Sequence, residues 1–196
     1  QRHDFMNHLQ VVFSLTEMQE YEDAMQYIER VYGDIQRVSS VLKTSIPAVN
    51  ALIAAKQADC EEHGILFKVE ISSAWVGVPV SGWEICRVFG NLIDNARDAI
   101  LDAGLPAEKY IHVSLGETLT AYTFSVSNNG PRISEADIES IFEEGFTTKS
   151  EGHGSGLSIV SEIMDTYGGH VSVHSDDAQT LFAGAFPKQG ILNVRS

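Results

Sequence analysis

The stretch that decides the fold is Asn91–Ile100, which reads NLIDNARDAI. Counted at 100° per residue with the residues just before it, this stretch predicts a helix with one broad apolar face and one polar face. The apolar face collects Ile85, Val88, Phe89, Leu92, Ala96, Ala99 and Ile100. The polar face collects Glu84, Arg87, Asn91, Asn95 and Asp98. Amide oxygens are neutral hard ligands that suit a Mg²⁺ ion already carrying phosphate, although an ordinary solvated face would explain amphipathicity alone.

A glycine run further along the chain, GHGSGL at residues 152–157, favours the ligand interpretation. Glycines let the backbone approach a ligand closely, and a helix that begins after them offers free N–H groups to phosphate. Thr148 and Lys149 lie just before the run and add a hydroxyl and a cation to an otherwise acidic region. Each feature alone is also typical of an ordinary loop. The glycines concerned are Gly152, Gly154 and Gly156.

Composition limits the class of protein. With 196 residues, 43% hydrophobic and 20% charged, the chain is typical of a globular protein of one or two domains. Its formal charge of −14 repels phosphate backbones, so we expect no nucleic-acid partner. Cys60 and Cys86 form no CxxC pair, which favours a reducing compartment. No apolar run has the length of a membrane span, and because the chain opens on Gln1 we expect a fragment of a longer protein.

The first 46 residues predict a two-helix hairpin. A first helix covers residues 2–19, and a second helix reaches about residue 43 with a coiled-coil seam. The seam consists of Ala24, Ile28, Val31, Ile35, Val38 and Leu42. A hairpin of this size cannot bury two apolar faces alone, so we expect it to pair with a second copy as a four-helix bundle. Packing of the hairpin on the rest of its own chain is the alternative.

Pro47 suits the first turn of a new helix and marks the expected domain boundary. The domains are then 1–46, a helical hairpin, and 47–190, with 191–196 as a tail. Helices and strands interleave without strict alternation, which predicts an α+β fold with a two-layer α/β sandwich. Helices are expected at 47–62, 82–102, 134–142 and 157–167, and strands at 65–71, 110–115, 122–126, 170–175 and 179–186, with loops at 75–82, 128–131 and 143–156.

Four motifs in this order resemble the ATP-binding domain of sensor histidine kinases and their gyrase-like and chaperone-like relatives. They are Asn91–Ile100, Asn128–Ile133, Phe146–Lys149 and Gly152–Leu157. The resemblance implies the Bergerat-type sandwich and two cofactors, ATP and Mg²⁺. It implies that Asn95 ligates Mg²⁺, that Asn91 assists near the phosphates, and that Gly154 and Gly156 hold phosphate. The other nucleotide-binding positions that it implies are Asp98, Asn128, Gly130, Thr148, Lys149, Gly152 and Leu157.

The first residues, Arg2–Asn7, read RHDFMN and resemble the phosphoacceptor motif of the same kinases, in the subgroup of citrate and dicarboxylate sensors and the sporulation phosphotransferase. An imidazole attacks phosphorus through a free ring nitrogen, and the adjacent Asp4 can orient His3 and take its proton. Asn7 lies one turn further on the same face, where an amide can position a water. His8 is a weaker candidate because no matching Asp and Asn flank it.

This resemblance also implies partners and a location. The kinase would phosphorylate His3 and pass the phosphoryl group to an aspartate on the receiver domain of a response regulator. It would form a homodimer through residues 1–46. The chain would be the cytoplasmic portion of a sensor that a missing N-terminal region attaches to the membrane.

The sequence departs from the family pattern at three positions. Asn128 stands where the family has Asp, Arg132 where it has Gly, and Asp98 where many kinases place Lys; Arg97 lies about 100° away from Asp98 on the helix. These departures keep open a scaffold with a degenerate nucleotide pocket, without kinase activity. A gyrase-type ATPase would need Glu four residues before Asn95, and that residue is Asn91.

Overall fold

A computed structural model of the chain describes residues 2–32, 43–104, 108–138, 140–143, 145–146 and 156–188. The chain divides into two units, residues 1–39 and residues 40–196. Thr44 is buried and pairs with Asn50 of the second unit, through its backbone N–H and its hydroxyl, at 2.9 Å each. The expected domain boundary at residue 46 stays a proposal.

The first unit contains a helical hairpin of α1 (Arg2–Glu17) and α2 (Tyr21–Tyr32). The chain reverses at Gln19, whose φ is 61°, and the turn is closed by a hydrogen bond from the N–H of Glu20 to the carbonyl of Leu15 at 2.9 Å. The part of the seam expected beyond residue 32 lies outside the described residues. Large apolar side chains are exposed along the hairpin: Leu9, Val11, Phe13, Met18, Tyr21 and Met25.

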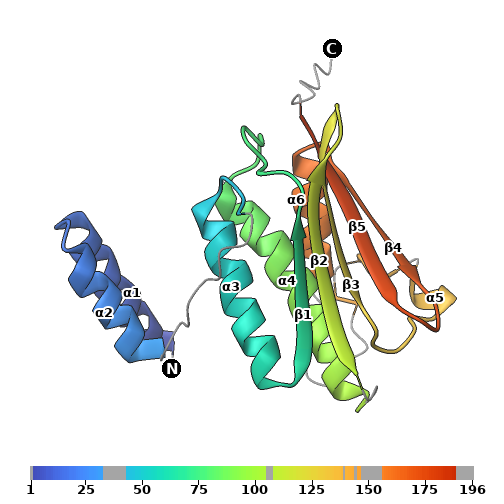
Figure 1. The fold of residues 1–196 in the computed structure, drawn as a ribbon, viewed down its shortest axis with the longest axis horizontal. Helices are drawn as coiled ribbons and strands as arrows, with labels where there is room; N and C mark the ends of the chain where they lie inside the picture. Colours follow the sequence, from blue (N-terminus) through green and yellow to red (C-terminus); the bar gives the residue numbers. More distant parts are fainter. Residues whose placement is uncertain are drawn as a thin grey trace. The chain divides into compact units, whose positions relative to one another are not determined.

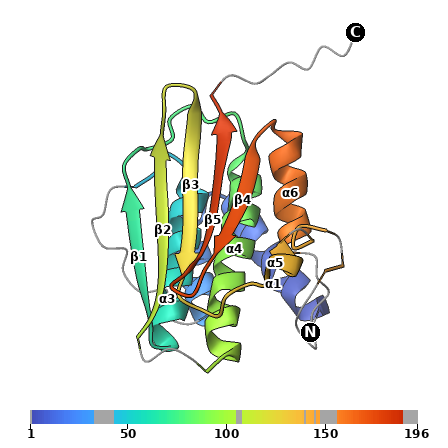
Figure 2. The same ribbon diagram turned by 90° about the vertical axis from the view of Figure 1, so that its right-hand side faces the viewer.

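The second unit is built on a five-stranded mixed sheet in the order β1-β2-β3-β5-β4 (Figure 2). β1 pairs parallel with β2, and the other neighbours are antiparallel. Helices α3, α4 and α6 cover one face of this sheet (Figure 1). The strands are β1 (Ile65–Ile71), β2 (Lys109–Glu117), β3 (Ala121–Asn128), β4 (His170–Ser175) and β5 (Thr180–Pro187). The helices are α3 (Pro47–Glu62), α4 (Gly82–Asp102), α5 (Glu135–Ile138) and α6 (Gly156–Thr166). The predicted two-layer α/β sandwich is confirmed.

Local signals explain where α4 and α6 begin and end. The hydroxyl of Ser81 accepts a hydrogen bond from the N–H of Glu84 at 3.2 Å and caps α4, an arrangement typical of the S-x-x-E sequence. α6 ends at Thr166, and Gly168 follows with a φ of 65°, which favours glycine because it carries no Cβ. Both boundaries fall within one residue of those expected.

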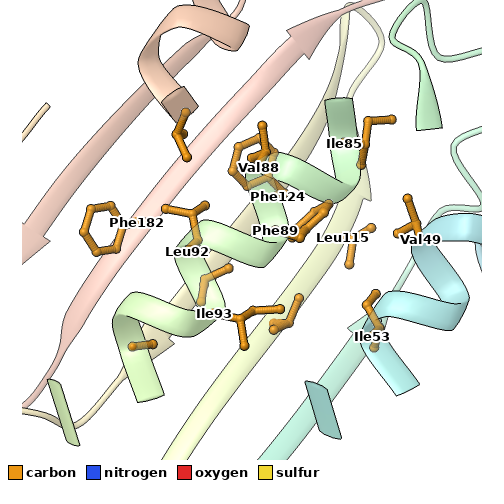
Figure 3. Close-up of a cluster of buried hydrophobic side chains, with 14 of the residues drawn as sticks. Val49, Ile53, Ile85, Val88, Phe89, Leu92, Ile93, Leu115, Phe124 and Phe182 are labelled. Atoms are coloured by element: carbon orange, nitrogen blue, oxygen red, sulfur yellow. The ribbon is translucent and has the colours of Figure 1, made fainter. Parts of the chain in front are cut away.

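The centre of the core lies between α4 and the sheet (Figure 3). Phe89 is fully buried, and its ring lies edge-on to Phe124 of β3 with ring centroids 5.4 Å apart. Trp75, in a segment expected to be only a loop, is also fully buried and packs on Phe89 at 6.1 Å. Its indole N–H donates to the carbonyl of Gly116 at 2.8 Å. The loop before α4 therefore belongs to the core.

The helix expected at residues 134–142 is wrong in its length. α5 covers only Glu135–Ile138, and Ser140–Phe142 form turns. Ile141 is buried, and the ring of Phe142 lies edge-on to Phe182 of β5 at 6.2 Å. We infer that the helix stops at Ile138 because the turns after it let Ile141 and Phe142 pack into the core. Among the described helices, none is both long and apolar enough to cross a membrane.

Both cysteines are free, as expected. Cys60 is fully buried on α3, and burial, together with the negative charge of Asp59, raises the pKa of its thiol to about 11. Burial also raises the pKa of Cys86. Neither side chain is a reactive thiolate near neutral pH.

Candidate functional site

The predicted two-faced helix is confirmed in α4. Its apolar side packs into the core, whereas Asn91, Asn95 and Asp98 are partly exposed on the other side. Ile93 is a further core residue that the helical pattern did not place there. Ala99, expected on the apolar arc, is only half-buried. Other candidate residues, Gly130 and Gly156, lie against α4.

Asn91 joins α4 to the start of α6. Its amide Nδ2 donates to the carbonyl of Arg87 one turn earlier, at 2.7 Å, which leaves the amide oxygen facing away from that bond. A Cβ built on Gly156, the first residue of α6, would lie 3.0 Å from this oxygen. Only glycine fits there without displacing Asn91. The last glycine of the predicted phosphate loop therefore lies against the first amide of the predicted magnesium helix.

The turn after β3 also lies against α4. A Cβ on Gly130 would come within 2.7 Å of the Asn128 amide nitrogen and 3.4 Å of the backbone carbon of Ala99. Asn128 ends β3 and is 3% exposed. The described part of the chain supplies no hydrogen-bond partner for its carboxamide. A carboxamide that ends a strand and forms no hydrogen bond with the described residues can bind a ligand through its oxygen or its NH₂.

A row of buried polar side chains, which sequence reasoning missed, extends from Asn128 across the end of the sheet. Asn128 pairs in register with Thr180 of β5, and Thr180 pairs with Ser175 of β4. Thr180 and Ser175 are 3% and 6% exposed, and their hydroxyl oxygens lie 2.6 Å apart. The N–H of Ile133 donates to the Ser175 hydroxyl at 2.9 Å. The only signal in the sequence was a polar residue at each strand end, where alternation predicts an apolar one.

Arg97 does not replace the lysine that many kinases place at position 98. It turns toward α3, where it pairs with Asp59, and it contacts Asp94 at 3.2 Å and Asp98 at 2.9 Å. Lys56 of α3 also binds Asp94, at 2.6 Å. Burial opposes the charge of Arg97, but the hydrogen bonds to Asp59 and Asp98 and the charge of Asp94 outweigh burial and raise its pKa. Asp98 thus forms an ion pair with Arg97.

Arg132, which stands in place of a family glycine, lies on the surface. Its guanidinium contacts Glu135 at 3.1 Å and Asp177 at 3.8 Å, and these two carboxylates are 85% and 94% exposed. Exposed pairs of this kind contribute little to stability. The substitution is therefore accommodated without burying a charge.

Several predicted site residues fall outside what the structure describes. His3, Asp4 and Asn7 belong to the first two turns of α1, but their side chains are not among the described parts. Thr148, Lys149, Gly152 and Gly154 lie outside the described residues altogether. Leu157, half-buried in the first turn of α6, follows directly after Gly156. The structure brings together Asn91, Asn95, Asp98, Asn128, Gly130, Gly156 and Leu157 around α4.

Comparison with known families agrees with this geometry. Residues 83–189 match the family described as histidine kinase-, DNA gyrase B-, and HSP90-like ATPase, and the chain belongs to this ATP-binding family. Residues 1–44 match the SpoOB-type α-helical domain of sensor kinases. The predicted resemblance to sensor histidine kinases is confirmed.

Individual relatives point to the same subgroup. The chain is 30% identical over 87% of its length to the sensor protein CitS of Halalkalibacterium halodurans. It is 30% identical over 96% of its length to a probable C4-dicarboxylate sensor kinase of the same organism. It spans 32% and 36% of these proteins, about one third of their length. Among solved structures, the catalytic domain of histidine kinase ThkA superimposes with a TM-score of 0.59 at 30% identity, covering 72% of this chain and 95% of that one.

Proposed function

We propose that this chain is the catalytic portion of a two-component sensor histidine kinase, which binds ATP with Mg²⁺ in residues 47–190 and phosphorylates itself on His3. The observation that carries the proposal is that two separate motifs, the turn at Gly130 and the glycine run that ends at Gly156, both lie against α4. Gly156 lies against Asn91, and Gly130 lies against Ala99. Such close approaches of glycine backbone to α4 leave room for a bound nucleotide beside the helix.

The polar face of α4 fits a magnesium ion. Asn95 is half-exposed, and no described residue forms a hydrogen bond with its carboxamide, so its oxygen is available as a ligand. The described residues contain no cluster of three or more His, Cys, Asp or Glu side chains that could hold a metal. One amide oxygen completed by phosphate oxygens and water is the kind of site that Mg²⁺ accepts. Bound there through Asn95, the ion would neutralise phosphate charge.

The reaction that we assign to α1 transfers the γ-phosphoryl group of ATP from its bridging oxygen to a ring nitrogen of His3. A ring nitrogen of His3 attacks the γ-phosphorus, the N–P bond forms, and the bond to the bridging oxygen breaks to release ADP. Asp4 orients the imidazole and takes its proton. The phosphoryl group then passes to an aspartate on the receiver domain of a response regulator. Such transfers depend mainly on positioning and charge neutralisation, and the chain supplies the acceptor and the nucleotide site on two separate units.

The assembly proposed for this chain is a homodimer through residues 1–46. Support comes from the large apolar side chains of α1 and α2 that a single copy leaves exposed, such as Phe13 at 62% and Met25 at 61%. Burial of both faces in a four-helix bundle would remove them from water. We place this portion in the cytoplasm, attached to a membrane sensor through an N-terminal region.

Incubation of the dimeric chain with γ-labelled ATP and Mg²⁺ tests the proposed function. Label that is lost in acid and kept in base identifies phosphohistidine and supports a kinase. Absence of label, together with binding of a response regulator, would instead support the scaffold with a degenerate pocket. Label that survives acid would indicate a hydroxyl acceptor and contradict the assignment of His3.

The Asn7→Ala variant separates two activities of α1. Phosphorylation requires His3, Asp4 and ATP, so we expect the rate of autophosphorylation to stay within about twofold of wild type. Dephosphorylation of the response regulator, where an amide positions a water, should slow by roughly tenfold or more. The measurement follows loss of labelled phosphate from the regulator with each variant. Equal rates with and without Asn7 would show that Asn7 does not position the water.

The Asn128→Asp variant tests whether Asn128 faces the nucleotide base. Asn128 can turn its oxygen toward the adenine amino group or its NH₂ toward the guanine oxygen, so by itself it discriminates poorly. A carboxylate accepts only, and a charge-assisted hydrogen bond exceeds a neutral one by about 1 kcal/mol. We expect ATP to bind about fivefold more tightly and GTP more weakly in calorimetric titrations.

Asn128→Ala is the matched control for this variant, because it removes the amide without adding a charge. It should weaken both nucleotides. If Asn128→Asp leaves the ratio of ATP to GTP affinity unchanged, Asn128 does not face the base.

A further inference from the structure

We propose that Arg87 is a further catalytic residue, whose guanidinium binds the γ-phosphate of ATP and stabilises its charge during transfer to His3. The proposal rests on the proposed function, because it requires ATP beside α4. This helix contains two cationic residues, Arg87 and Arg97. Arg97 is held by three aspartates of the cluster between α3 and α4. Arg87 is therefore the cation of α4 that remains for a phosphate.

The candidate nucleotide residues follow one another along α4. Gly130, in the turn after the strand end that we assign to the base, lies against Ala99. Asn95, the proposed magnesium ligand, is one turn nearer the start of the helix. Asn91 is one turn further in the same direction and lies against Gly156, where α6 begins. The phosphates therefore extend from the base toward the start of α4.

Arg87 is the next residue in this order. It lies four residues before Asn91, so both side chains are on the same side of the helix, about 6 Å apart along its axis. The carbonyl of Arg87 accepts the hydrogen bond from the Asn91 amide at 2.7 Å, which ties the two positions together. An arginine side chain is long enough to span one helical turn. The guanidinium of Arg87 therefore reaches the end of the phosphate chain, where the γ-phosphate lies.

The guanidinium of Arg87 has donors to spare. Its Nη1 donates to the carboxylate of Glu84 at 2.9 Å, and among the described contacts this is its one ion pair. The side chain of Arg87 is 36% exposed, and a pair between such residues on one helix contributes little to stability. Exchange of Glu84 for a phosphate therefore costs little. The planar fork of the remaining N–H groups matches two oxygens of a phosphate.

The reaction places negative charge where Arg87 can meet it. As the bond from His3 to the γ-phosphorus forms and the bond to the bridging oxygen breaks, charge is spread over the three other oxygens of the γ-phosphoryl group. A guanidinium fixed at these oxygens lowers the energy of the transition state. ADP has no γ-phosphate, so its affinity does not depend on this contact. Arg87 should thus affect ATP and catalysis but not ADP.

Calorimetric titration of ATP and ADP against the whole chain, with Mg²⁺ present, tests this assignment in Arg87→Gln. We expect ATP to bind about fivefold less tightly, while ADP binds within about twofold of wild type. The rate of autophosphorylation at saturating ATP should fall about tenfold or more. Arg87→Lys keeps the charge but loses the fork, so it should recover part of both losses.

Two controls separate contact with phosphate from other effects of the change. Glu84→Gln breaks the same ion pair from its other side and leaves Arg87 in place. It should bind ATP at least as tightly as wild type, because an anion near the γ-phosphate is removed. Arg132→Gln removes an equal charge from an arginine that is 45% exposed, and it should leave the ratio of ADP to ATP dissociation constants unchanged.

The ADP measurement makes the outcomes distinct. Equal weakening of ATP and ADP in Arg87→Gln would indicate a structural role and overturn the inference. Wild-type ATP affinity and wild-type labelling in this variant would also overturn it, while the proposed function stands. Wild-type protein that binds neither ATP nor ADP would overturn the proposed function, and the inference with it.

Discussion

Replacement of His3 by glutamine is expected to abolish autophosphorylation while the dissociation constant for ATP stays at its wild-type value. Glutamine keeps a polar side chain of similar length but has no ring nitrogen that can attack phosphorus. The nucleotide residues around α4 belong to the other unit, residues 40–196, so their geometry is independent of this change. Acid-labile labelling from γ-labelled ATP and calorimetric titration of ATP measure the two quantities on the same preparation.

His8→Gln is the control for this loss, since it removes an imidazole from the same helix at a position without the flanking Asp4 and Asn7 pattern. We expect it to keep at least half of the wild-type labelling. Full labelling in His3→Gln with loss in His8→Gln would move the phosphoacceptor to His8. Loss of ATP binding in His3→Gln would instead contradict the independence of the two units.

The sequence was sufficient to predict α4 to the residue, because several signals agree there. A 3.6-residue apolar period continues through Gly82–Asp102, Ser81 caps the start, and Gly104 with a φ of 62° follows the end. Agreement between period, cap and stop is what makes a local sequence specify one structure. The polar face that those signals define also carried the prediction of the nucleotide site.

The buried polar row could not be predicted in the same way. Thr180 and Ser175 each look like an ordinary polar residue near a turn, and only strand register places them next to Asn128. Register depends on pairing between segments some 50 residues apart, about which local periodicity carries no information. Trp75 does lie in the expected loop, but its burial by contacts with Phe89 and Gly116 depends on residues distant in the sequence and could not be predicted either.

The helix expected at residues 134–142 shows the opposite error, in which a local signal was given too much weight. Ser134 caps the segment by accepting from the N–H of Asp137 at 3.2 Å, so a helix does begin there. Its four residues in α5 are too few to outweigh the burial of Ile141 and the contact of Phe142 with the sheet. Tertiary packing decides where so short a helix ends.

Replacement of Arg97 by methionine should have the largest effect on stability among the charged residues of α4. The change keeps a long apolar side chain but removes the cation that Asp59, Asp94 and Asp98 share, while Lys56 still pairs with Asp94. Arg97 is only 24% exposed, so water compensates the loss poorly. We expect the free energy of unfolding to fall by about 2 kcal/mol. Urea denaturation measures this quantity.

Lys68→Met is the matched control, because Lys68 is 61% exposed and pairs with a single carboxylate, Glu70, at 2.6 Å. Its loss should cost about 0.5 kcal/mol or less. If Arg97→Met costs no more than Lys68→Met, the cluster between α3 and α4 does not stabilise the fold.

The same variant also tests whether Asp98 lies near the bound phosphates. Without Arg97 the carboxylate of Asp98 would repel them, and ATP affinity should fall about fivefold at low salt, with a smaller loss at high salt because of screening. Adding Asp98→Asn to Arg97→Met removes the carboxylate and should restore ATP affinity to within about twofold of wild type. Restoration of affinity without restoration of the free energy of unfolding would separate the two roles of Arg97, since Asp59 and Asp94 still lack the guanidinium. An ATP affinity that is low in the single variant and equally low in the double variant would show that Asp98 does not face the nucleotide.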